Sequence, residues 1–337
     1  MNIYFLMLRR IVLTVPVMLG VTVITFAVAH AVPGDPARAI AGMYADQQTV
    51  DTIRHQWGLD RPLPVQYWSY LRHLATGDLG QSITTRDSVL GDVAHRLPAT
   101  LELTLFATLL MCVFGILLGV AAAVWRNRSP DHLARLVVVL GAAVPSFFLG
   151  LLLQLLFFRY FNWLPATGRL DDLTAPPYHI TGLYLIDSAL TLNGHVFVDA
   201  LKHILLPGFT LALLGMAGIT RMTRATMVGV LQQDYIRAAR ARGIGFRSLV
   251  FRHALKNSLI PTVTVVGLLF GSMIGGAVVI EWIFSWPGIG SYAANAITSL
   301  DYTAIMGSAL AIAIIYVVVN LFVDISYMLL NPQIRER

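Results

Sequence analysis

The amino-acid sequence predicts an all-α, polytopic membrane protein with six transmembrane helices. Of its 337 residues, 56% are hydrophobic and only 12% are charged, whereas soluble domains average about 25% charged residues. This composition excludes an ordinary soluble enzyme and a disordered chain. Six uncharged apolar runs approach the roughly 20 residues that a helix needs to cross a bilayer. The uneven charge of the segments between these runs supports the same fold class.

The predicted spans are the runs 11–32, 103–125, 136–158, 204–220, 257–280 and 302–323. Four of them contain an internal proline: Pro16, Pro145, Pro207 and Pro261. Because a helix in lipid tolerates proline only where neighbours satisfy the freed carbonyls, we expect one packed bundle. The fourth run is the shortest, and we expect its helix to extend back through Lys202 and His203, whose polar ends would reach the membrane interface.

The first span has an alternative interpretation as a cleavable signal peptide. Arg9 and Arg10 precede an apolar stretch that ends in an A-x-A-like sequence at 29–31. However, this stretch of 22 residues is longer than the roughly 7–15 apolar residues of a signal peptide. The length favours a retained helix.

Loop charge predicts the orientation of the bundle. One set of segments carries 15 Lys and Arg against 3 Asp and Glu: 1–10, 126–135, 221–256 and 331–337. The other set carries 9 against 13: 33–98, 159–202 and 281–301. Short cytoplasmic loops collect basic residues, so we expect the first set inside and both termini cytoplasmic. The net charge of +6 then follows from topology, and we expect no nucleic-acid partner, which would need arginines on a soluble groove.

The segments assigned to the outside differ in composition. Segment 33–98 is expected to be a cap on the bundle, with short helices near 47–57 and 67–74. Segment 159–202 is rich in Pro, Gly and Asp and predicts a loop. Segment 281–301 contains a Pro-Gly pair that favours a tight turn, and its two tryptophans fit an interfacial belt: Trp282 and Trp286.

The inside segment between the fourth and fifth spans predicts a short helix, a glycine break and a second helix. Residues 234–242 are rich in Ala and Arg, which are strong helix formers. Asp234 suits the first turn and Gly243 suits the C-terminal end. The second helix begins near Phe246 and runs into the fifth span. Composition leaves two interpretations, a solvated basic loop or a docking helix for a cytoplasmic partner.

The spacing within this segment resembles the EAA loop of ABC-importer permeases, which reads E-A-A, three residues, G, nine residues, I-x-L-P. The segments 237–239, Gly243 and 253–256 hold that spacing, with Arg237 in place of the glutamate and Lys256 in place of the proline. The chain is more similar to the dipeptide/oligopeptide/nickel branch, where D-Y-I-R-x-A-R-A-x-G and H-A-L-x-N-x-x-x-P recur. Further matching segments follow in order along the chain: 32–36, 77–80, 98–103, 281–290 and 320–335.

The resemblance implies the type I ABC-importer permease fold and a B-type subunit of a dipeptide-permease-like system. It divides the chain into a first helix (1–32), an external cap (33–98), a type-1 transmembrane domain (99–330) with a coupling loop (221–256), and a cytoplasmic tail (331–337). It places the protein in the bacterial cytoplasmic (inner) membrane.

The function implied by the resemblance is import of peptides through a pathway formed with a second homologous permease subunit. One or two cytoplasmic ABC ATPase subunits would supply the energy, and a periplasmic or lipid-anchored solute-binding protein would deliver the solute. Nickel, opines and glutathione are alternative solutes. The chain has no phosphate-binding loop and is expected to be no enzyme, with no cofactor or metal of its own, so ATP and magnesium would bind to the ATPases.

The resemblance assigns ATPase coupling to ten consecutive residues: Tyr235, Ile236, Arg237, Ala238, Ala239, Arg240, Ala241, Arg242, Gly243 and Ile244. Pro261 is expected to break the helix after the coupling loop. Gly271 and Gly275 form a small-xxx-small pair, which faces either the second permease or a neighbouring helix of the same chain.

Two other functional classes compete with this interpretation. An ion-coupled secondary transporter would show inverted repeats or broken half-helices, and neither is evident. An intramembrane enzyme would need paired acids, or a nucleophile and a base, in mid-span, and Asp324 is the sole candidate for a mid-span charge. The acids nearest the spans lie at span ends, where each is either a functional candidate or a simple interfacial acid: Glu102, Glu281 and Asp324.

Overall fold

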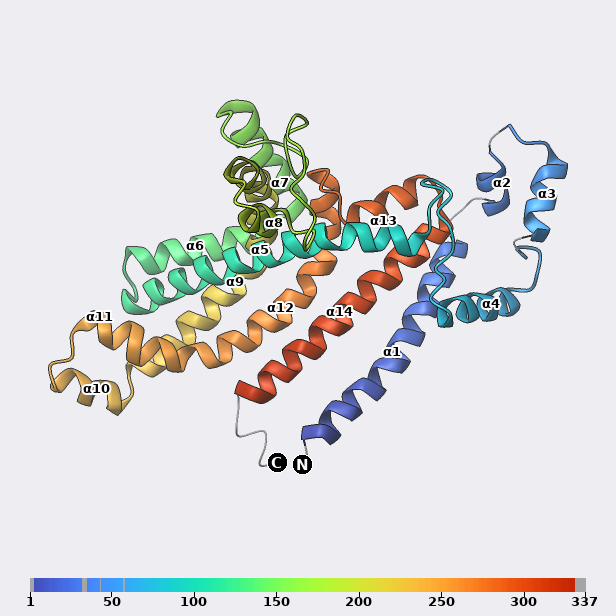
Figure 1. Cartoon of the computed structure of the whole chain (residues 1–337). Helices are drawn as coiled ribbons and strands as arrows, with labels where there is room; N and C mark the ends of the chain where they lie inside the picture. Colours follow the sequence, from blue (N-terminus) through green and yellow to red (C-terminus); the bar gives the residue numbers. More distant parts are fainter. Residues whose placement is uncertain (1–2, 32–34, 43, 57, 331–337) are drawn as a thin grey trace.

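The computed structural model describes residues 3–31, 35–42, 44–56 and 58–330 (Figure 1). These residues form helices and one isolated antiparallel bridge between Gln81 and Ser88, which confirms the all-α prediction. The helices are α1 (Ile3–Ala31), α2 (Pro36–Ala41), α3 (Gln47–Gln56), α4 (Leu63–Ala75), α5 (Val89–Val124), α6 (Ser129–Ala143), α7 (Ser146–Leu153), the π-helix η1 (Gln154–Tyr160), α8 (Tyr184–Leu190), α9 (Gly194–Leu231), α10 (Asp234–Ala241), α11 (Phe246–Ser248), the π-helix η2 (Leu249–Ala254), α12 (Leu255–Ile283), α13 (Ile289–Thr298) and α14 (Tyr302–Leu330).

Four helical segments are long and apolar enough to cross a membrane: Val89–Val124, Gly194–Leu231, Phe246–Ile283 and Tyr302–Val323. Val12–Val28 and Ser146–Tyr160 are shorter apolar helices. The predicted span 136–158 is therefore not one continuous helix. It is divided between α6 and α7 because Pro145 has no N–H to donate and disfavours a helical residue before it.

The prediction of a helix break at Pro261 is wrong, because α12 continues through this residue. The proline removes the hydrogen bond to the Asn257 carbonyl, four residues earlier. The next carbonyl, that of Ser258, accepts a hydrogen bond from the Thr226 hydroxyl of α9 at 3.1 Å, so a neighbouring helix packs on and bonds to this turn, and packing within a bundle allows a helix to continue through proline. The irregular stretch is instead the π-helix η2, which lies upstream of Pro261.

Helices α5 and α9 begin well before their apolar runs, at Val89 and Gly194. Helix α5 begins after Ser88, whose hydroxyl accepts a hydrogen bond from the Gly91 N–H at 3.1 Å. Helix α9 extends through Lys202 and His203, as predicted. Lys202 is exposed, but His203 is buried and its Nδ1 lies 3.2 Å from Asp199 Oδ1. The expectation that His203 would reach the interface is wrong, because a carboxylate one turn away holds its ring inside.

Segment 159–202 is also more ordered than predicted, since it contains α8 and the start of α9. The expected cap helices are present as α3 and α4. In Figure 1, α4 crosses the outer part of α1, and α1 lies beside α14. Helix α4 of the cap therefore lies against the bundle, whereas α2 and α3 lie beside each other, away from the long helices (Figure 1).

The centre of the bundle is the contact between α5 and α9, with α12 packed on α9. Glycines let α5 and α9 approach closely: a Cβ added to Gly119 would lie 2.6 Å from the Thr223 Cβ. Large buried side chains from all three helices fill the core, among them Leu103, Met111, Ile204, Leu211, Ile219 and Met273.

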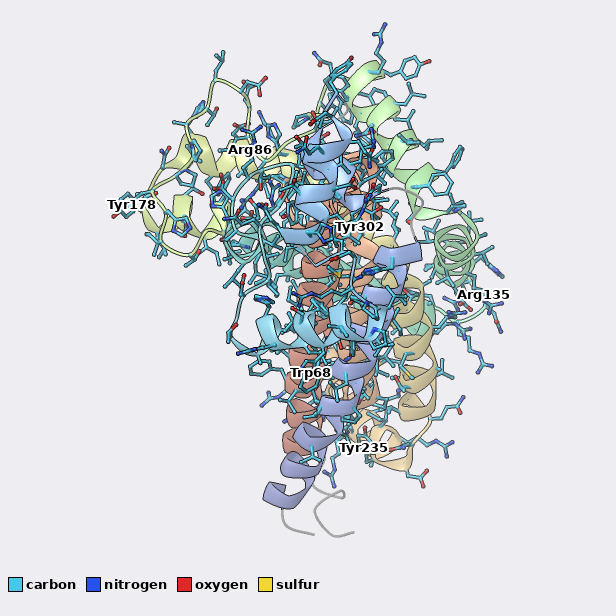
Figure 2. All side chains as sticks on the ribbon, turned by 90° about the vertical axis from the view of Figure 1, so that its right-hand side faces the viewer. Trp68, Arg86, Arg135, Tyr178, Tyr235 and Tyr302 are labelled. Carbon is cyan, nitrogen blue, oxygen red and sulfur yellow. The ribbon has the colours of Figure 1, made fainter. Side chains whose placement is uncertain are left out.

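The elements outside this core collect at two ends. Figure 1 shows α10, α11 and the turn between α5 and α6 at one end, and α8 and α13 at the other. Figure 2, turned by 90°, likewise shows Tyr235 of α10 and Tyr178 near α8 towards opposite ends. We refer to these as the α10 end and the α13 end.

Candidate functional site

Helix α10 has a defined end that comes from its own sequence. Gly243 has φ +80°, a left-handed conformation that glycine adopts without strain. Its N–H donates to the Arg240 carbonyl at 3.0 Å, and the Ile244 N–H donates to the Ala239 carbonyl at 3.3 Å. This pair of bonds is the Schellman motif, which satisfies carbonyls left free at a helix C-terminus. The predicted glycine end of the helix is confirmed.

One face of α10 is anchored in the bundle. Ile236 is 1% exposed and Ala239 is 9% exposed. Both belong to a cluster with apolar side chains of α5, α9, η2 and the residue after the helix: Val120, Ala123, Met227, Leu249, Val250, Ala254 and the partly buried Ile244. The Tyr235 hydroxyl also accepts a hydrogen bond from Asn257 Nδ2 at 2.8 Å. A displacement of α10 would therefore act on α5 and on the start of α12.

The opposite face of α10 is exposed and carries small residues between arginines: Arg237, Ala238, Arg240, Ala241 and Arg242. Arg237 makes an ion pair with Asp234 at 3.4 Å, and both side chains are largely exposed, so the pair contributes little. The alanines leave the helix backbone accessible, and the arginines offer charge to an acidic surface. The predicted coupling residues thus separate into an outer group that faces solvent and an inner group, Ile236, Ala239 and Ile244, that positions the helix.

A buried acid close to α10 was not singled out by the sequence analysis. Asp131 of α6 is fully buried. Arg224 of α9 donates two hydrogen bonds to its carboxylate, from Nε at 2.7 Å and from Nη2 at 2.9 Å. Arg135 and the Asn127 N–H also donate to this carboxylate. The Arg224 hydrogen bonds hold the pKa of Asp131 well below its ordinary value. The i, i+4 spacing of Asp131 and Arg135 was the only local signal for this clamp.

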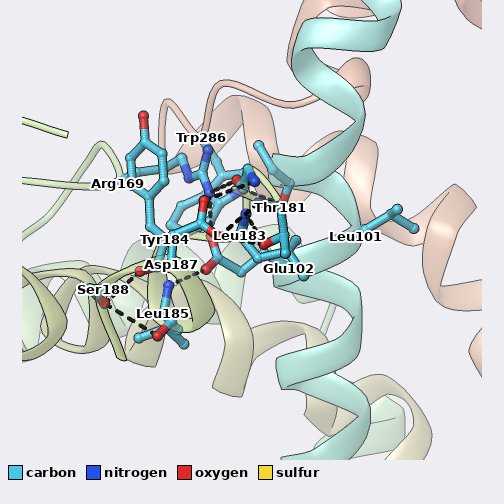
Figure 3. A network of polar contacts seen from close by, with 12 residues as sticks. Leu101, Glu102, Arg169, Thr181, Leu183, Tyr184, Leu185, Asp187, Ser188 and Trp286 are labelled. Atoms are coloured by element: carbon cyan, nitrogen blue, oxygen red, sulfur yellow. Dashed lines mark hydrogen bonds and ion pairs between the residues drawn. The ribbon is translucent and has the colours of Figure 1, made fainter. Parts of the chain in front are cut away.

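The α13 end contains a second buried ion pair (Figure 3). Arg169 donates from Nη2 to Glu102 Oε2 and to the Gly182 carbonyl, and both charged side chains are buried. The Leu185 N–H donates to Glu102 Oε1 at 2.8 Å. The guanidinium of Arg169 also lies 3.5 Å from the centre of the Tyr184 ring, a cation–π contact. Glu102 is therefore not a simple interfacial acid; it fixes α8 and the preceding loop to α5.

The loop before α8 is held by a further acid. Asp187 accepts hydrogen bonds from the Thr181 hydroxyl at 2.6 Å and from the N–H groups of Ile180, Thr181 and Gly182. Burial alone would raise its pKa, but these donors leave the pKa of Asp187 below its ordinary value. The loop around Arg169 is thus ordered at both of its ends.

Glu281 joins three elements at the same end of the molecule. Its carboxylate is fully buried and accepts hydrogen bonds from the Thr100 hydroxyl at 2.7 Å and from the Ser291 N–H at 3.0 Å. The Thr100 hydroxyl in turn accepts from the Ile289 N–H at 2.9 Å. Gly288 lies so close to the carboxylate that a Cβ there would collide with it. Glu281 therefore connects α12 to α5 and to the start of α13.

The two tryptophans of this region have opposite environments. Trp282 is 58% exposed, as expected of an interfacial residue. Trp286 is 1% exposed and its Nε1–H donates to the Ala99 carbonyl at 2.8 Å, so the predicted interfacial position of Trp286 is wrong. It fills the core between α5 and α12. The Asp324 side chain lies outside the described residues.

The two glycines of the predicted packing pair also differ. A Cβ at Gly271 would lie 3.0 Å from Asn320 Oδ1 and 3.2 Å from Tyr316 Cε2 of α14, whereas a Cβ at Gly275 would meet no atom within 4 Å. Gly271 therefore packs within the chain, and the surface at Gly275 is free for another molecule.

The apolar helical bundle, with four helical segments long enough to cross a membrane, defines an integral membrane protein. Residues 3–104 match the family described as "Binding-prot-dependent transport system membrane comp, N-term", and residues 115–336 match "Binding-protein-dependent transport system inner membrane component". The chain belongs to this family of transport-system permeases, whose members are membrane subunits and not enzymes.

Relatives match nearly the whole chain. The probable D,D-dipeptide transport system permease protein of Escherichia coli is 46% identical over 94% of this chain and 94% of its own. The di/tripeptide transport system permease protein of Pseudomonas aeruginosa is 44% identical over 98% of both chains. The glutathione transport system permease protein of Salmonella typhimurium is 38% identical over 98% of both chains. The family resemblance predicted from the motifs is confirmed.

Proposed function

We propose that this chain forms, with a second homologous permease subunit, the membrane pathway of an ATP-driven importer of short peptides. The three relatives described above carry names that specify dipeptides, di- and tripeptides or glutathione, which is itself a tripeptide. The observation that carries the importer proposal is α10, a short helix that is anchored on one face and exposed on the other. Glutathione is the second candidate solute, and opines and nickel chelates are alternatives of the wider family.

The proposed topology has six spans and cytoplasmic termini. The first and last helices start and finish towards the α10 end (Figure 1), and the described basic segments 126–135 and 221–256 lie towards the same end. Under the positive-inside rule this end faces the cytoplasm. The α13 end then faces the solute-binding protein.

In the proposed mechanism, two cytoplasmic ATPase subunits bind ATP and magnesium, and one of them seats α10. Closure of the ATPase pair displaces α10. Because Ile236 and Tyr235 connect this helix to α5 and α12, the displacement biases the bundle between two rigid-body arrangements. Catalysis of ATP hydrolysis belongs to the partners.

The test is reconstitution of the complete complex with its binding protein in proteoliposomes. We expect complexes whose α10 end faces the vesicle interior to take up a labelled dipeptide when ATP is enclosed in the vesicles. Uptake should stop when this ATP is depleted. Stable isolation of the chain without any ATPase, together with uptake driven by an ion gradient alone, would overturn the proposal in favour of a secondary transporter.

A further inference from the structure

We propose that the turn between α5 and α6, residues 125–128, is a binding site for the anionic phospholipid headgroups of the cytoplasmic leaflet. The inference rests on the proposed topology, which places this turn inside. It adds a lipid ligand to a protein whose other proposed partners are proteins and solutes.

The first argument is an excess of positive charge. Four arginines surround a single acid at this place: Arg126, Arg128, Arg135 and Arg224. That acid, Asp131, is already bound by Arg224 and Arg135. Arg126 and Arg128 are exposed, and in the described part of the chain neither makes an ion pair. Their guanidinium groups are therefore available to a phosphate, which they can bind in bidentate geometry.

The second argument is the rigidity of the turn. Asn127 has φ +59°, and its N–H donates to Asp131 Oδ2 at 3.0 Å. The Arg128 N–H donates to the Trp125 carbonyl at 3.0 Å, and the Asp131 N–H donates to the Arg128 carbonyl at 2.9 Å. The buried clamp between Asp131 and Arg224 thus fixes the backbone that carries the two arginines. A ligand would not have to order this backbone, which lowers the entropic cost of binding.

The third argument identifies a lipid as the occupant. Helix α6 exposes Leu133, Leu136 and Val139, each more than half exposed, on the face that leads away from the turn. Trp125 is 46% exposed at the end of α5, and tryptophan favours the boundary between apolar and polar layers of a membrane. The arginines lie at the edge of an apolar surface. In a phospholipid the phosphate likewise lies at the edge of the acyl chains, so the phosphate could meet the arginines while the chains cover the apolar side chains. The exposed face of α10 differs, because its side chains there are arginine and alanine.

The test compares two double variants of the full complex in phosphatidylcholine nanodiscs that contain a minor fraction of phosphatidylglycerol. Native mass spectrometry measures how strongly the complex retains phosphatidylglycerol over phosphatidylcholine. Each basic residue near an anionic surface strengthens binding about five-fold, so we expect Arg126→Gln/Arg128→Gln to lower the preference roughly thirty-fold. Arg61→Gln/Arg72→Gln removes the same charge from two exposed arginines of the cap segment and should leave the preference unchanged.

An unchanged lipid preference in Arg126→Gln/Arg128→Gln, or an equal loss in the cap variant Arg61→Gln/Arg72→Gln, would overturn the lipid site. The Arg126→Gln/Arg128→Gln variant could instead lose its ATPase subunits in pure phosphatidylcholine while it keeps the lipid preference. This result would assign the turn to ATPase binding and would also overturn the lipid site.

A separate measurement distinguishes failure of the proposed topology from failure of the lipid site. Arg128→Cys in a Cys112→Ser background should react with a membrane-impermeant thiol reagent only from the cytoplasmic side. Reaction from the outside alone would reject the topology and the lipid site together. Reaction from the inside without a lipid preference would reject the lipid site only.

Discussion

The two ends of the bundle use charged residues in opposite ways. At the α13 end, Glu102 and Glu281 are buried and every strong contact that they make lies within the chain. At the α10 end, the described part of the chain buries one acid, Asp131, and arginines on α10 and on the 125–128 turn remain exposed. Buried charges that are hydrogen-bonded to several neighbouring elements fix the arrangement of those elements. The difference suggests that the α13 end is fixed by contacts within the chain, whereas the α10 end is completed by other molecules.

The largest expected effect comes from a variant that breaks the internal network of the α13 end. Arg169→Ala would leave Glu102 buried without its cation, which costs about 3–5 kcal/mol when a buried pair loses one partner. We expect the thermal unfolding of the purified chain in detergent to shift accordingly. Arg159→Ala, an exposed arginine before the same loop, is the control and should change stability by less than about 0.5 kcal/mol.

The double variant Glu102→Leu/Arg169→Met sharpens this prediction, because it removes both charges together. Apolar replacement of a whole buried pair is often neutral, so the double variant should be more stable than Arg169→Ala. If both single and double variants unfold like the unmodified chain, then the pair does not hold the α13 end.

The next effect concerns Asp131, the acid that the described residues bury at the α10 end. Asp131→Ala removes the acceptor of Arg224 and Arg135, but both arginines retain access to solvent, since their side chains are 26% and 53% exposed. We expect a loss of about 1–3 kcal/mol, smaller than for Arg169→Ala. A loss as large as that of Arg169→Ala would show that the α10 end depends on internal charge just as the α13 end does.

The Asp131 clamp also predicts a pH dependence. The pKa of this carboxyl is lowered in the folded protein, so the folded form binds its proton less readily than the unfolded form, whose pKa is about 3.9. The stabilisation is complete above the unfolded pKa and is lost as pH falls below it towards the folded value. Thermal unfolding of the unmodified chain and of Asp131→Ala should therefore converge on acidification below about pH 4. Parallel curves down to the lowest measurable pH would contradict the assignment.

The third effect separates the placement of α10 from the stability of the fold. Gly243→Val forces a β-branched residue into a left-handed conformation, at a local cost of about 1–2 kcal/mol. No atom lies within 4 Å of the added Cβ, so the effect is attributed to backbone strain and not to a collision of this atom. We expect a nearly unchanged unfolding temperature, with ATP hydrolysis by the assembled complex no longer coupled to uptake of labelled dipeptide.

Gly245→Ala is a close control for this variant, since Gly245 has φ −62° and also has no atom within 4 Å of an added Cβ. It should transport normally. If Gly243→Val is expressed normally and still couples ATP hydrolysis to dipeptide uptake, then α10 does not dock the ATPase as proposed.

The contrast between the two ends also explains which features could be predicted from sequence. Helix α10 and its glycine end depend on residues within ten positions of one another, so propensity and capping rules identify them. Arg169 contacts Glu102 across 67 positions, and Trp286 contacts Ala99 across 187. No local pattern pairs such residues, so Trp286 resembled an interfacial tryptophan and Glu102 a span-end acid. Pro261 was misread for the same reason, because the hydroxyl that supports its turn comes from Thr226 on another helix.

The smallest expected effect tests whether the arginines of α10 meet a partner. Exposed charges contribute only tenths of a kcal/mol within a chain, so Arg240→Glu/Arg242→Glu should leave the unfolding temperature of the isolated chain unchanged. The same variant should weaken copurification of the ATPase subunits at low salt, because charge reversal places like charges against an acidic surface. Screening shortens electrostatic interactions to about 8 Å at physiological ionic strength and to about 3 Å at 1 M salt, so the difference from the unmodified chain should shrink as salt is added. Arg72→Glu, an exposed arginine of α4 in the cap, should have no effect on copurification at any salt concentration. Equal assembly of the α10 variant and the Arg72 variant would mean that the exposed arginines of α10 serve membrane orientation alone, and the proposed contrast between the two ends would then rest on the buried networks only.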